Sequence, residues 1–432
     1  MASHSNHQRS PPCPHPLHIY ADDEDSIASP APIVPFARSR LQELQLDTTA
    51  LPSICTSTST ASTMNPDPKL SNYLTQLYTV SYLVFFAIWG TLARLGLQAL
   101  TFYPGAPVIF SELWANVAGT FIIGFLAEDR RLFAAEWGNR GANLPEPPVI
   151  PIKDKARHAK VKKTIPLYIG LATGFCGSFT SFSSFIRDVF LTMANQLKAP
   201  VYHPASSSTT STTAARNDGY SVLAVLATIL VTISLCFSAL QVGAHFALLV
   251  QRFMPTLSFR LTRRIIDPLF VLLGLGSWLA AMLLAIFPPH NAWRSQALFA
   301  CVFAPLGCLA RYYTSLLLNP TNPSFPLGTF AVNIFGTAVL AMAYDLQRLS
   351  IRPAGGVVGG SLAGCQVLQG VQDGFCGALT TVSTWIAEMK SLNRGKAYLY
   401  GGASLLVALA LMLCIMGGVW WSIGWESIIC GT

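Results

Sequence analysis

One short pattern of glycine, hydroxyl and aromatic residues occurs twice in the chain, 200 positions apart. Residues 174–185 read GFCGSFTSFSSF and residues 374–385 read GFCGALTTVSTW. Glycine weakens a helix, so each stretch predicts a break that frees backbone carbonyls. Free carbonyls inside a membrane are tolerated only where they are buried in protein or line a cavity. The two stretches therefore predict a polar site at mid-membrane, where carbonyls from both copies could ligate a monovalent cation.

Hydroxyl and aromatic side chains follow each glycine pair. The hydroxyl residues are Thr180, Ser181, Ser183 and Ser184 in the first copy and Thr380, Thr381, Ser383 and Thr384 in the second. Phe182 and Phe185 are three positions apart, so they share one helix face. Aromatic ring edges carry partial positive charge, so edges turned toward a pore would support a small anion. Core packing is the alternative interpretation of such a pair.

Two asparagines precede the repeated stretches at matching places. Asn116 lies in NVAGT and Asn333 in NIFGT, each followed three residues later by glycine. A buried amide in a membrane is costly unless it finds a partner. One interpretation is a polar contact between helices, and the other is a donor facing a polar path. The identical spacing favours the path or a role at the repeat interface.

Two arginines recur in the same way, Arg94 in GTLAR and Arg311 in GCLAR. An arginine near the end of a span is often structural, or extends its charged end to the interface. An arginine at a pore mouth would instead attract anions. Both interpretations stay open on the sequence.

The composition around these residues is that of a membrane protein. The chain of 432 residues is 52% hydrophobic and 11% charged, against about 25% charged residues in soluble domains. The net charge of +8 is explained by cytoplasmic loops, where membrane proteins concentrate Lys and Arg. A nucleic-acid-binding surface would place aromatic residues among basic ones, whereas the aromatic residues here lie in apolar runs. Nine runs are long enough to cross a bilayer, at 75–102, 108–127, 165–193, 220–250, 266–287, 296–318, 327–345, 364–389 and 397–425.

Basic residues set the expected orientation. Lys and Arg concentrate in the loops 128–164, 251–265 and 390–396, which all fall on the same side as the N-terminus. The N-terminus is therefore expected in the cytoplasm and the C-terminus outside the cell. Residues 1–72, rich in Ser, Thr and Pro, predict a disordered cytoplasmic tail.

The matched motifs predict a duplicated architecture. GTLAR and NVAGT return 217 positions later, while the GFCG stretch returns after 200, because the first copy has a longer basic loop. We predict an all-α membrane protein with four-helix repeats at 73–250 and 291–432, joined by a linker with its own helix at 251–290. An odd number of linker helices inverts the second repeat relative to the first, a common transporter construction.

Enzyme chemistry has little support in this sequence. It contains no Ser-His-Asp set, HExxH, phosphate-binding loop or paired carboxylate site. The cysteines within apolar runs have neither CxxC spacing nor a nearby histidine, which favours small buried residues over metal ligands.

Taken together, these motifs resemble the fluoride channel family, which comprises the bacterial Fluc (CrcB) channels and their fused eukaryotic exporters. The likeness lies in G-x-x-x-R of the first helix, N-x-x-G of the second and the GFCG stretch of the third. It covers most of 75–425. Bacterial members resemble antiparallel dimers of four-helix subunits, which a fused form would hold in one chain.

The resemblance implies roles for particular residues. It implies a pore lined by Asn116, Asn333, Phe182, Phe185, Trp385, Tyr400 and Ser404. It also implies a structural sodium ion held by the carbonyls of Gly177, Thr180, Gly377 and Thr380. The two halves depart from the family pattern differently, since Val382 and Trp385 replace the two Phe residues and Ala224 stands where the counterpart of Ser404 is expected. The departures predict that only one of two ancestral pores conducts, without saying which.

The expected function is passive, fluoride-selective export across the plasma membrane by a single chain in the lipid bilayer, with fluoride and sodium as its partners. Two alternatives stay open. One is a proton-coupled fluoride antiporter using Asp188 or Glu388. The other is a small-multidrug-type exporter, for which a mid-span glutamate is missing from both repeats.

Overall fold

The computed structural model of the chain describes residues 68–134, 161–201, 210–212, 217–290, 294–349 and 361–426. The predicted tail up to residue 67 and most of the first basic loop lie outside the described residues. In the described part almost every segment is helical, which confirms the all-α membrane class. The exception is a two-stranded antiparallel ladder, β1 (Ala199–Val201) with β2 (Thr210–Thr212).

Each half of the chain contributes three long helices and one interrupted helix. In the first half the long helices are α2 (Pro68–Thr101), α3 (Glu112–Glu128) and α8 (Asp218–Leu249). In the second half they are α12 (Phe299–Leu318), α13 (Leu327–Arg348) and α17 (Arg394–Met412), the last continuing through η8 (Leu413–Gly417) into α18 (Gly418–Ser422). The linker helix α10 (Asp267–Ile286) stands between the halves.

The interrupted helices carry the repeated glycine stretches. The first consists of α5 (Pro166–Ile169), η2 (Gly170–Cys176), α6 (Gly177–Phe179) and α7 (Phe182–Met193). The second consists of α14 (Leu362–Gly370), η7 (Val371–Cys376), α15 (Gly377–Leu379) and α16 (Ser383–Ser391). Both η2 and η7 are π-helical turns, which are frequent at functional sites.

Short segments complete the described chain. They are η3 (Val250–Arg252), α9 (Phe259–Leu261) and η4 (Thr262–Ile266) before α10, η5 (Arg294–Leu298) before α12, and η6 (Asn319–Thr321) after it. Within the described ranges, seven helices are long and apolar enough to cross a membrane. The other two predicted spans correspond to α3, with 17 residues, and to the second interrupted helix.

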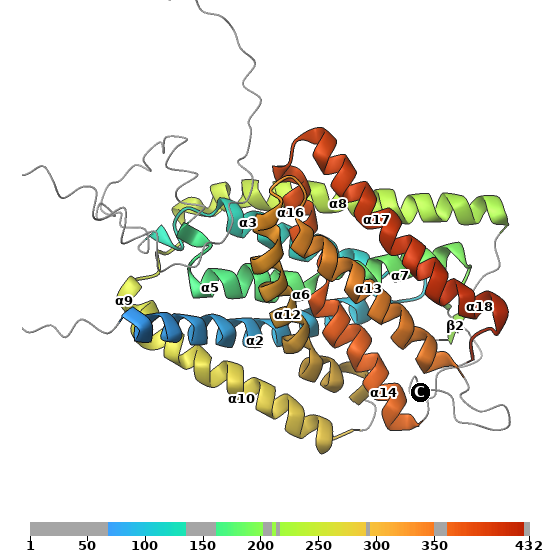
Figure 1. The fold of residues 1–432 in the computed structure, drawn as a ribbon, viewed down its shortest axis with the longest axis horizontal. Helices are drawn as coiled ribbons and strands as arrows, with labels where there is room; N and C mark the ends of the chain where they lie inside the picture. Colours follow the sequence, from blue (N-terminus) through green and yellow to red (C-terminus); the bar gives the residue numbers. More distant parts are fainter. Residues whose placement is uncertain are drawn as a thin grey trace, which may run out of the picture.

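Burial separates the lipid-facing helices from the central ones. Only 17% of the most apolar window of α10 is buried within the protein, against 78% for the first interrupted helix. This matches the sequence, in which α10 carries no charge after Asp267 while Gly, Ser and Thr interrupt the third span. In the view of Figure 1, α8 and α10 lie at opposite edges of the bundle with α6 and α7 between them.

Packing between the halves produces two helix seams. In one, α7 of the first half packs against α13 and α17 of the second. In the other, α16 of the second half packs against α3 and α8 of the first. The short helices α6 and α15, next to the two breaks, contact each other between these seams. We refer to these as the α7–α13–α17 seam and the α3–α8–α16 seam.

Candidate ion path at the two helix breaks

Both interrupted helices break at a threonine. Thr180 (φ −101°, ψ 145°) and Thr380 (φ −93°, ψ 152°) are extended, between helical residues on either side. The breaks predicted from the glycines are therefore present, but they lie three residues beyond Gly177 and Gly377, which stay helical. Instead, these two glycines allow the guanidinium groups of Arg311 and Arg94 to pack closely against the helix.

The two asparagines hold the breaks in shape. The Asn116 Oδ1 atom accepts a hydrogen bond from the Ser181 backbone N–H at 2.9 Å, and Asn333 Oδ1 accepts one from Thr381 N–H, also at 2.9 Å. Their amide nitrogens point back to the carbonyls of the same two residues, at 3.5 and 3.2 Å. Each amide thus bonds to the backbone of its own repeat, which is nearer to the helix-contact interpretation than to a free donor in a path.

These bonds leave particular carbonyls without their helical donors. In a continuous helix, Ser181 N–H would bond to the Gly177 carbonyl and Ser184 N–H to the Thr180 carbonyl. Here Ser181 N–H bonds to Asn116, and Ser184 N–H donates to the Ser181 hydroxyl at 3.2 Å.

The second repeat does the same. Thr381 N–H bonds to Asn333, and Thr384 N–H donates to the Thr381 hydroxyl at 3.4 Å. The carbonyls released from helical bonding therefore include those of Gly177, Thr180, Gly377 and Thr380, the four ligands that the family resemblance implies for sodium. The carbonyls of Phe179 and Leu379 are released as well, because Ser183 N–H and Ser383 N–H donate to the hydroxyls of Thr380 and Thr180. A hard monovalent cation prefers such oxygen donors, so the residues present fit the ion chemically.

Hydroxyl groups join the two breaks to each other. Thr180 Oγ1 lies 3.1 Å from both Thr381 Oγ1 and Ser383 Oγ. The reciprocal contacts place Thr380 Oγ1 3.3 Å from Ser181 Oγ and 3.0 Å from Ser183 Oγ. All of these side chains are buried. The result is one hydroxyl cluster built equally from residues about 200 positions apart.

The two arginines reach across to the opposite repeat. Arg94 donates to the Asp373 carbonyl, and Arg311 donates to the Thr173 carbonyl at 2.7 Å. Their guanidinium groups lie directly against Gly377 and Gly177, where a methyl group would overlap them. Both arginines are almost fully buried, at 1% and 3% exposure, so neither reaches the membrane interface or stands at an open mouth. They are cross-repeat contacts that place two positive charges beside the breaks.

Aromatic rings cluster beside the hydroxyl groups, on α7 and α16. The rings of Phe182 and Phe185 meet edge-on with centroids 6.1 Å apart, and Trp385 meets Phe182 edge-on at 5.1 Å. All three are buried. The indole Nε1–H of Trp385 is buried and has no hydrogen-bond partner among the described residues. Trp385 therefore adds a free donor where the family pattern predicts a second Phe.

The predicted residues of α17 join this cluster. Tyr400 is fully buried, its ring meets that of Phe325 edge-on at 5.1 Å, and its hydroxyl donates to Glu388 at 2.7 Å. Ser404 is also fully buried and donates to the Tyr400 carbonyl. Glu388 accepts a second bond from Thr329 at 2.7 Å. The Glu388 carboxylate is thus hydrogen-bonded to α13 and α17 at one end of the α7–α13–α17 seam.

The other seam has lost the equivalent groups. Tyr220, the counterpart of Tyr400, is 67% exposed and lies on the outer surface of the helices. Ala224 stands in place of Ser404, and Val382 in place of Phe182. Buried Phe182, Phe185, Tyr400 and Ser404 therefore all belong to the α7–α13–α17 seam.

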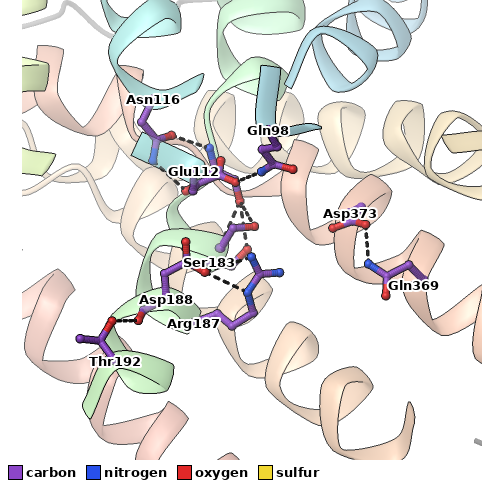
Figure 2. A network of polar contacts seen from close by, with 11 residues as sticks. Gln98, Glu112, Asn116, Ser183, Arg187, Asp188, Thr192, Gln369 and Asp373 are labelled. Carbon is purple, nitrogen blue, oxygen red and sulfur yellow. Dashed lines mark hydrogen bonds and ion pairs between the residues drawn. The ribbon is translucent and has the colours of Figure 1, made fainter. Parts of the chain in front are cut away.

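A charged group around Arg187 was not predicted from the sequence, which pointed only to Asp188 among its members. Near the start of α3, Glu112 accepts a bond from Gln98, while Arg187 pairs with Asp188 at 3.1 Å on α7 (Figure 2). Asp373 on η7 accepts from Gln369 at 2.6 Å. These charges are distant in sequence, and only the positions of Asp188 and Glu388 repeat, so periodicity alone does not reveal the group.

Comparison with known proteins identifies the family of this chain. The family model described as CrcB-like protein, camphor resistance, matches residues 81–244 and 298–419, one block in each half with α10 between them. The chain belongs to the CrcB-like family.

Two named fungal relatives match most of the chain, and a bacterial channel matches about a quarter of it. Fluoride export protein 1 of Neurospora crassa is 52% identical, over 84% of this chain and 70% of that protein. Fluoride export protein 1 of Candida albicans is 33% identical, over 79% of this chain and 80% of its own. The fluoride-specific ion channel FluC of Geotalea uraniireducens is 35% identical, over 28% of this chain and 87% of that protein. A channel of that size is similar to about one repeat of this CrcB-like chain. No solved structure matches it.

Proposed function

We propose that this CrcB-like chain is a fluoride channel that exports fluoride across the plasma membrane, down its electrochemical gradient, and that one chain forms the complete channel. The observation that carries the proposal is the α7–α13–α17 seam. It gathers buried aromatic edges and hydroxyl groups from both halves beside two helix breaks. Relatives that match the chain over most of its length are named fluoride export proteins.

The α7–α13–α17 seam is the conducting path in this proposal. Its aromatic pair, Phe182 and Phe185, comes from the first half, while Tyr400 and Ser404 come from the second. The opposite seam has an exposed Tyr220, and Ala224 and Val382 stand in place of Ser404 and Phe182, so an anion there would meet fewer hydroxyl and ring-edge donors. A desolvated anion needs such donors along its whole route, since an unpaired charge in the membrane is very costly.

The chemistry of this seam suits a small, hard anion. Ring edges carry partial positive charge, and hydroxyl groups donate to an ion that has lost its water. A close-packed lining excludes larger halides by size. Asn116 and Asn333 contribute by holding the breaks, and their remaining amide N–H groups are the only part of them left to face an ion.

A sodium ion at four of the released carbonyls is part of the proposal. Gly177, Thr180, Gly377 and Thr380 would hold it, and its charge would help to offset the cost of an anion at mid-membrane. Arg94 and Arg311 already place two positive charges beside this centre. The ion's role in the proposal is structural, because its ligands are backbone groups at the contact of the two repeats.

The reciprocal contacts support inverted repeats. Each arginine donates to a carbonyl beside the break of the other repeat. Each asparagine bonds to the break of its own repeat. Each hydroxyl contact from the first break to the second has an equivalent contact from the second to the first. A twofold axis in the membrane plane relates contacts in this way, as in other transporters with inverted repeats.

The charge pattern supports a cytoplasmic N-terminus and an extracellular C-terminus. Basic loops lie at one end of the spans, and Cys365, near the start of α14, lies one span away from the basic loop 390–396. Cys365 is disulfide-bonded, whereas the cysteines at 176, 236, 301, 308, 376 and 414 are free thiols. Because disulfides persist on the oxidising side of a membrane, this bond favours the same orientation. An inside-negative potential then drives an anion outward with about 2.3 kcal/mol per charge per 100 mV.

Coupled transport is not favoured by this geometry. Glu388 already accepts hydrogen bonds from Thr329 and Tyr400, and Asp188 is paired with Arg187. Neither carboxylate is an unpartnered group of the kind that a proton antiporter or a multidrug exporter would load and unload.

Fluoride efflux from liposomes that contain the purified protein tests the proposal. A potassium gradient with valinomycin sets the voltage, and chloride release serves as the control. We expect fluoride release without chloride release, unchanged by an imposed pH gradient. Release that follows the pH gradient would support an antiporter, and no release from folded protein would exclude fluoride conduction.

A further inference from the structure

Arg187 continues the polar face of α7 beyond the hydroxyl cluster. It lies four residues after Ser183 and three after Ser184, so the three side chains share one face of the helix. Ser183 and Ser184 are buried at 0% and 2% exposure, and Ser183 belongs to the hydroxyl cluster at the breaks. The polar face of α7 therefore runs from the centre of the protein to Arg187.

The guanidinium group of Arg187 keeps one donor edge free. Its Nε and Nη2 atoms both donate to Asp188 Oδ1, at 3.2 and 3.1 Å. Its Nη1 atom makes no hydrogen bond to any described residue and is not sealed from solvent, and 18% of the side chain is exposed. One pair of N–H donors thus faces the space beside α7.

Carboxylates surround this guanidinium without covering its free edge. Arg187 interacts electrostatically with Asp373 and Glu112 as well as with Asp188. In Figure 2 its guanidinium group lies between Asp188 and the Glu112–Gln98 pair, with Asp373 and Gln369 across from it. A lone arginine would hold an anion tightly, whereas nearby negative charge weakens the binding. An ion site in a conducting path must be weak enough for the ion to leave.

The other repeat has no such group. Ala387 occupies the position of Arg187, and Thr329 that of Glu112. The arginine of this set therefore occurs only on α7, the helix that carries Phe182 and Phe185. Arg187 thus lies on a helix of the α7–α13–α17 seam, the one that we propose to conduct.

We propose that the free Nη1 edge of Arg187 is an anion site at the outer end of the path, where a small halide such as fluoride arrives from the serine face of α7 before release. This inference rests on the proposed function. Asp188 holds the guanidinium in place, and Glu112 and Asp373 favour release of the ion.

A charge-restoration experiment tests this site. Arg187→Cys is purified, labelled in detergent with a methanethiosulfonate that carries either a trimethylammonium or a sulfonate group, and reconstituted for fluoride efflux. We expect the unlabelled variant to conduct about tenfold less than wild type, as on losing one charge-assisted hydrogen bond to the ion. The cationic label should recover most of the flux and the anionic label none.

Matched controls separate charge at this position from other effects. Labelled wild type accounts for the native cysteines, and Ala387→Cys carries the same labels at the equivalent place in the other repeat, where the sign of the label should not matter. The double variant Arg187→Gln with Asp188→Asn removes both charges, and it should stay slow if the guanidinium itself binds the ion.

The outcomes distinguish this site from the channel proposal. If wild type does not release fluoride, the proposed function fails. If wild type conducts and Arg187→Cys conducts equally, or if both labels give the same flux, the Arg187 site is wrong while the channel stands. If Arg187→Cys does not elute as folded protein, Arg187→Lys and Arg187→Gln replace it, and equal flux from these two overturns the site.

Discussion

A methyl group at Gly177 should damage the contact between the repeats. The added carbon of Gly177→Ala would overlap the Arg311 guanidinium, which is buried and bonded to the Thr173 carbonyl. Displacing it removes one hydrogen bond to a charged group, worth about 1.5–3 kcal/mol. Since Gly177 is helical, alanine also gains about 1 kcal/mol of helix propensity. The net loss of stability is therefore roughly 0.5–2 kcal/mol.

A second glycine-to-alanine substitution, at a helical position without close neighbours, measures the gain in helix propensity by itself. Gly276 in α10 is also helical, but a methyl group there would meet no atom within 4 Å. Gly276→Ala should be stabilising by about 1 kcal/mol, so the two variants should differ by the full 1.5–3 kcal/mol or so. Thermal unfolding in detergent, followed by size-exclusion chromatography, measures both. If Gly177→Ala unfolds at the same temperature as Gly276→Ala, the cross-repeat role of Arg311 is refuted.

Three further outcomes follow from the site and its surroundings. Phe182→Leu should lower fluoride efflux about tenfold, while Tyr220→Phe, in the seam that we propose to be silent, should leave it unchanged; equal losses would contradict the assignment of the path. Replacing sodium by N-methyl-D-glucamine should lower the unfolding temperature, and returning sodium rather than potassium should restore it; an unchanged temperature would argue against the ion. Burial lowers the pKa of Lys162 to about 8, from an ordinary 10.5. Between these two pH values the unfolded chain binds more protons than the folded chain. The free energy of unfolding should therefore rise with pH over that window, by at most about 3 kcal/mol. Lys162→Met should lose this rise in thermal scans at pH 7 and 9.5, and a rise that persists in the variant would assign it to other groups.

Lys162 also illustrates what a loop residue can do in this fold. Its ammonium group is buried and donates to the carbonyls of Leu126, Ala127 and Asp129 at the end of α3. The sequence indicated only a basic loop that sets orientation. The carbonyls that end a helix need donors, and here the loop supplies one.

Much of the architecture is readable from the sequence because membrane spans and repeats are strong local signals. Apolar runs of sufficient length identify the helices, and the matched GTLAR, NVAGT and GFCG stretches identify two equivalent halves. The same repetition pointed to Asn116 and Asn333. It did not reveal what their amides bond to, because a spacing says where a side chain stands on its helix and not which backbone it meets.

The sequence by itself determined the class of protein, the position of the breaks to within a few residues and the residue types available for an anion. The tertiary structure decided which of these residues work together. It brought Arg94 and Arg311 to the opposite breaks, buried Tyr400 while leaving Tyr220 exposed, and placed Arg187 among carboxylates from three helices. Such pairings depend on how helices from the two halves pack, and packing is set by the whole set of surfaces at once rather than by any local pattern.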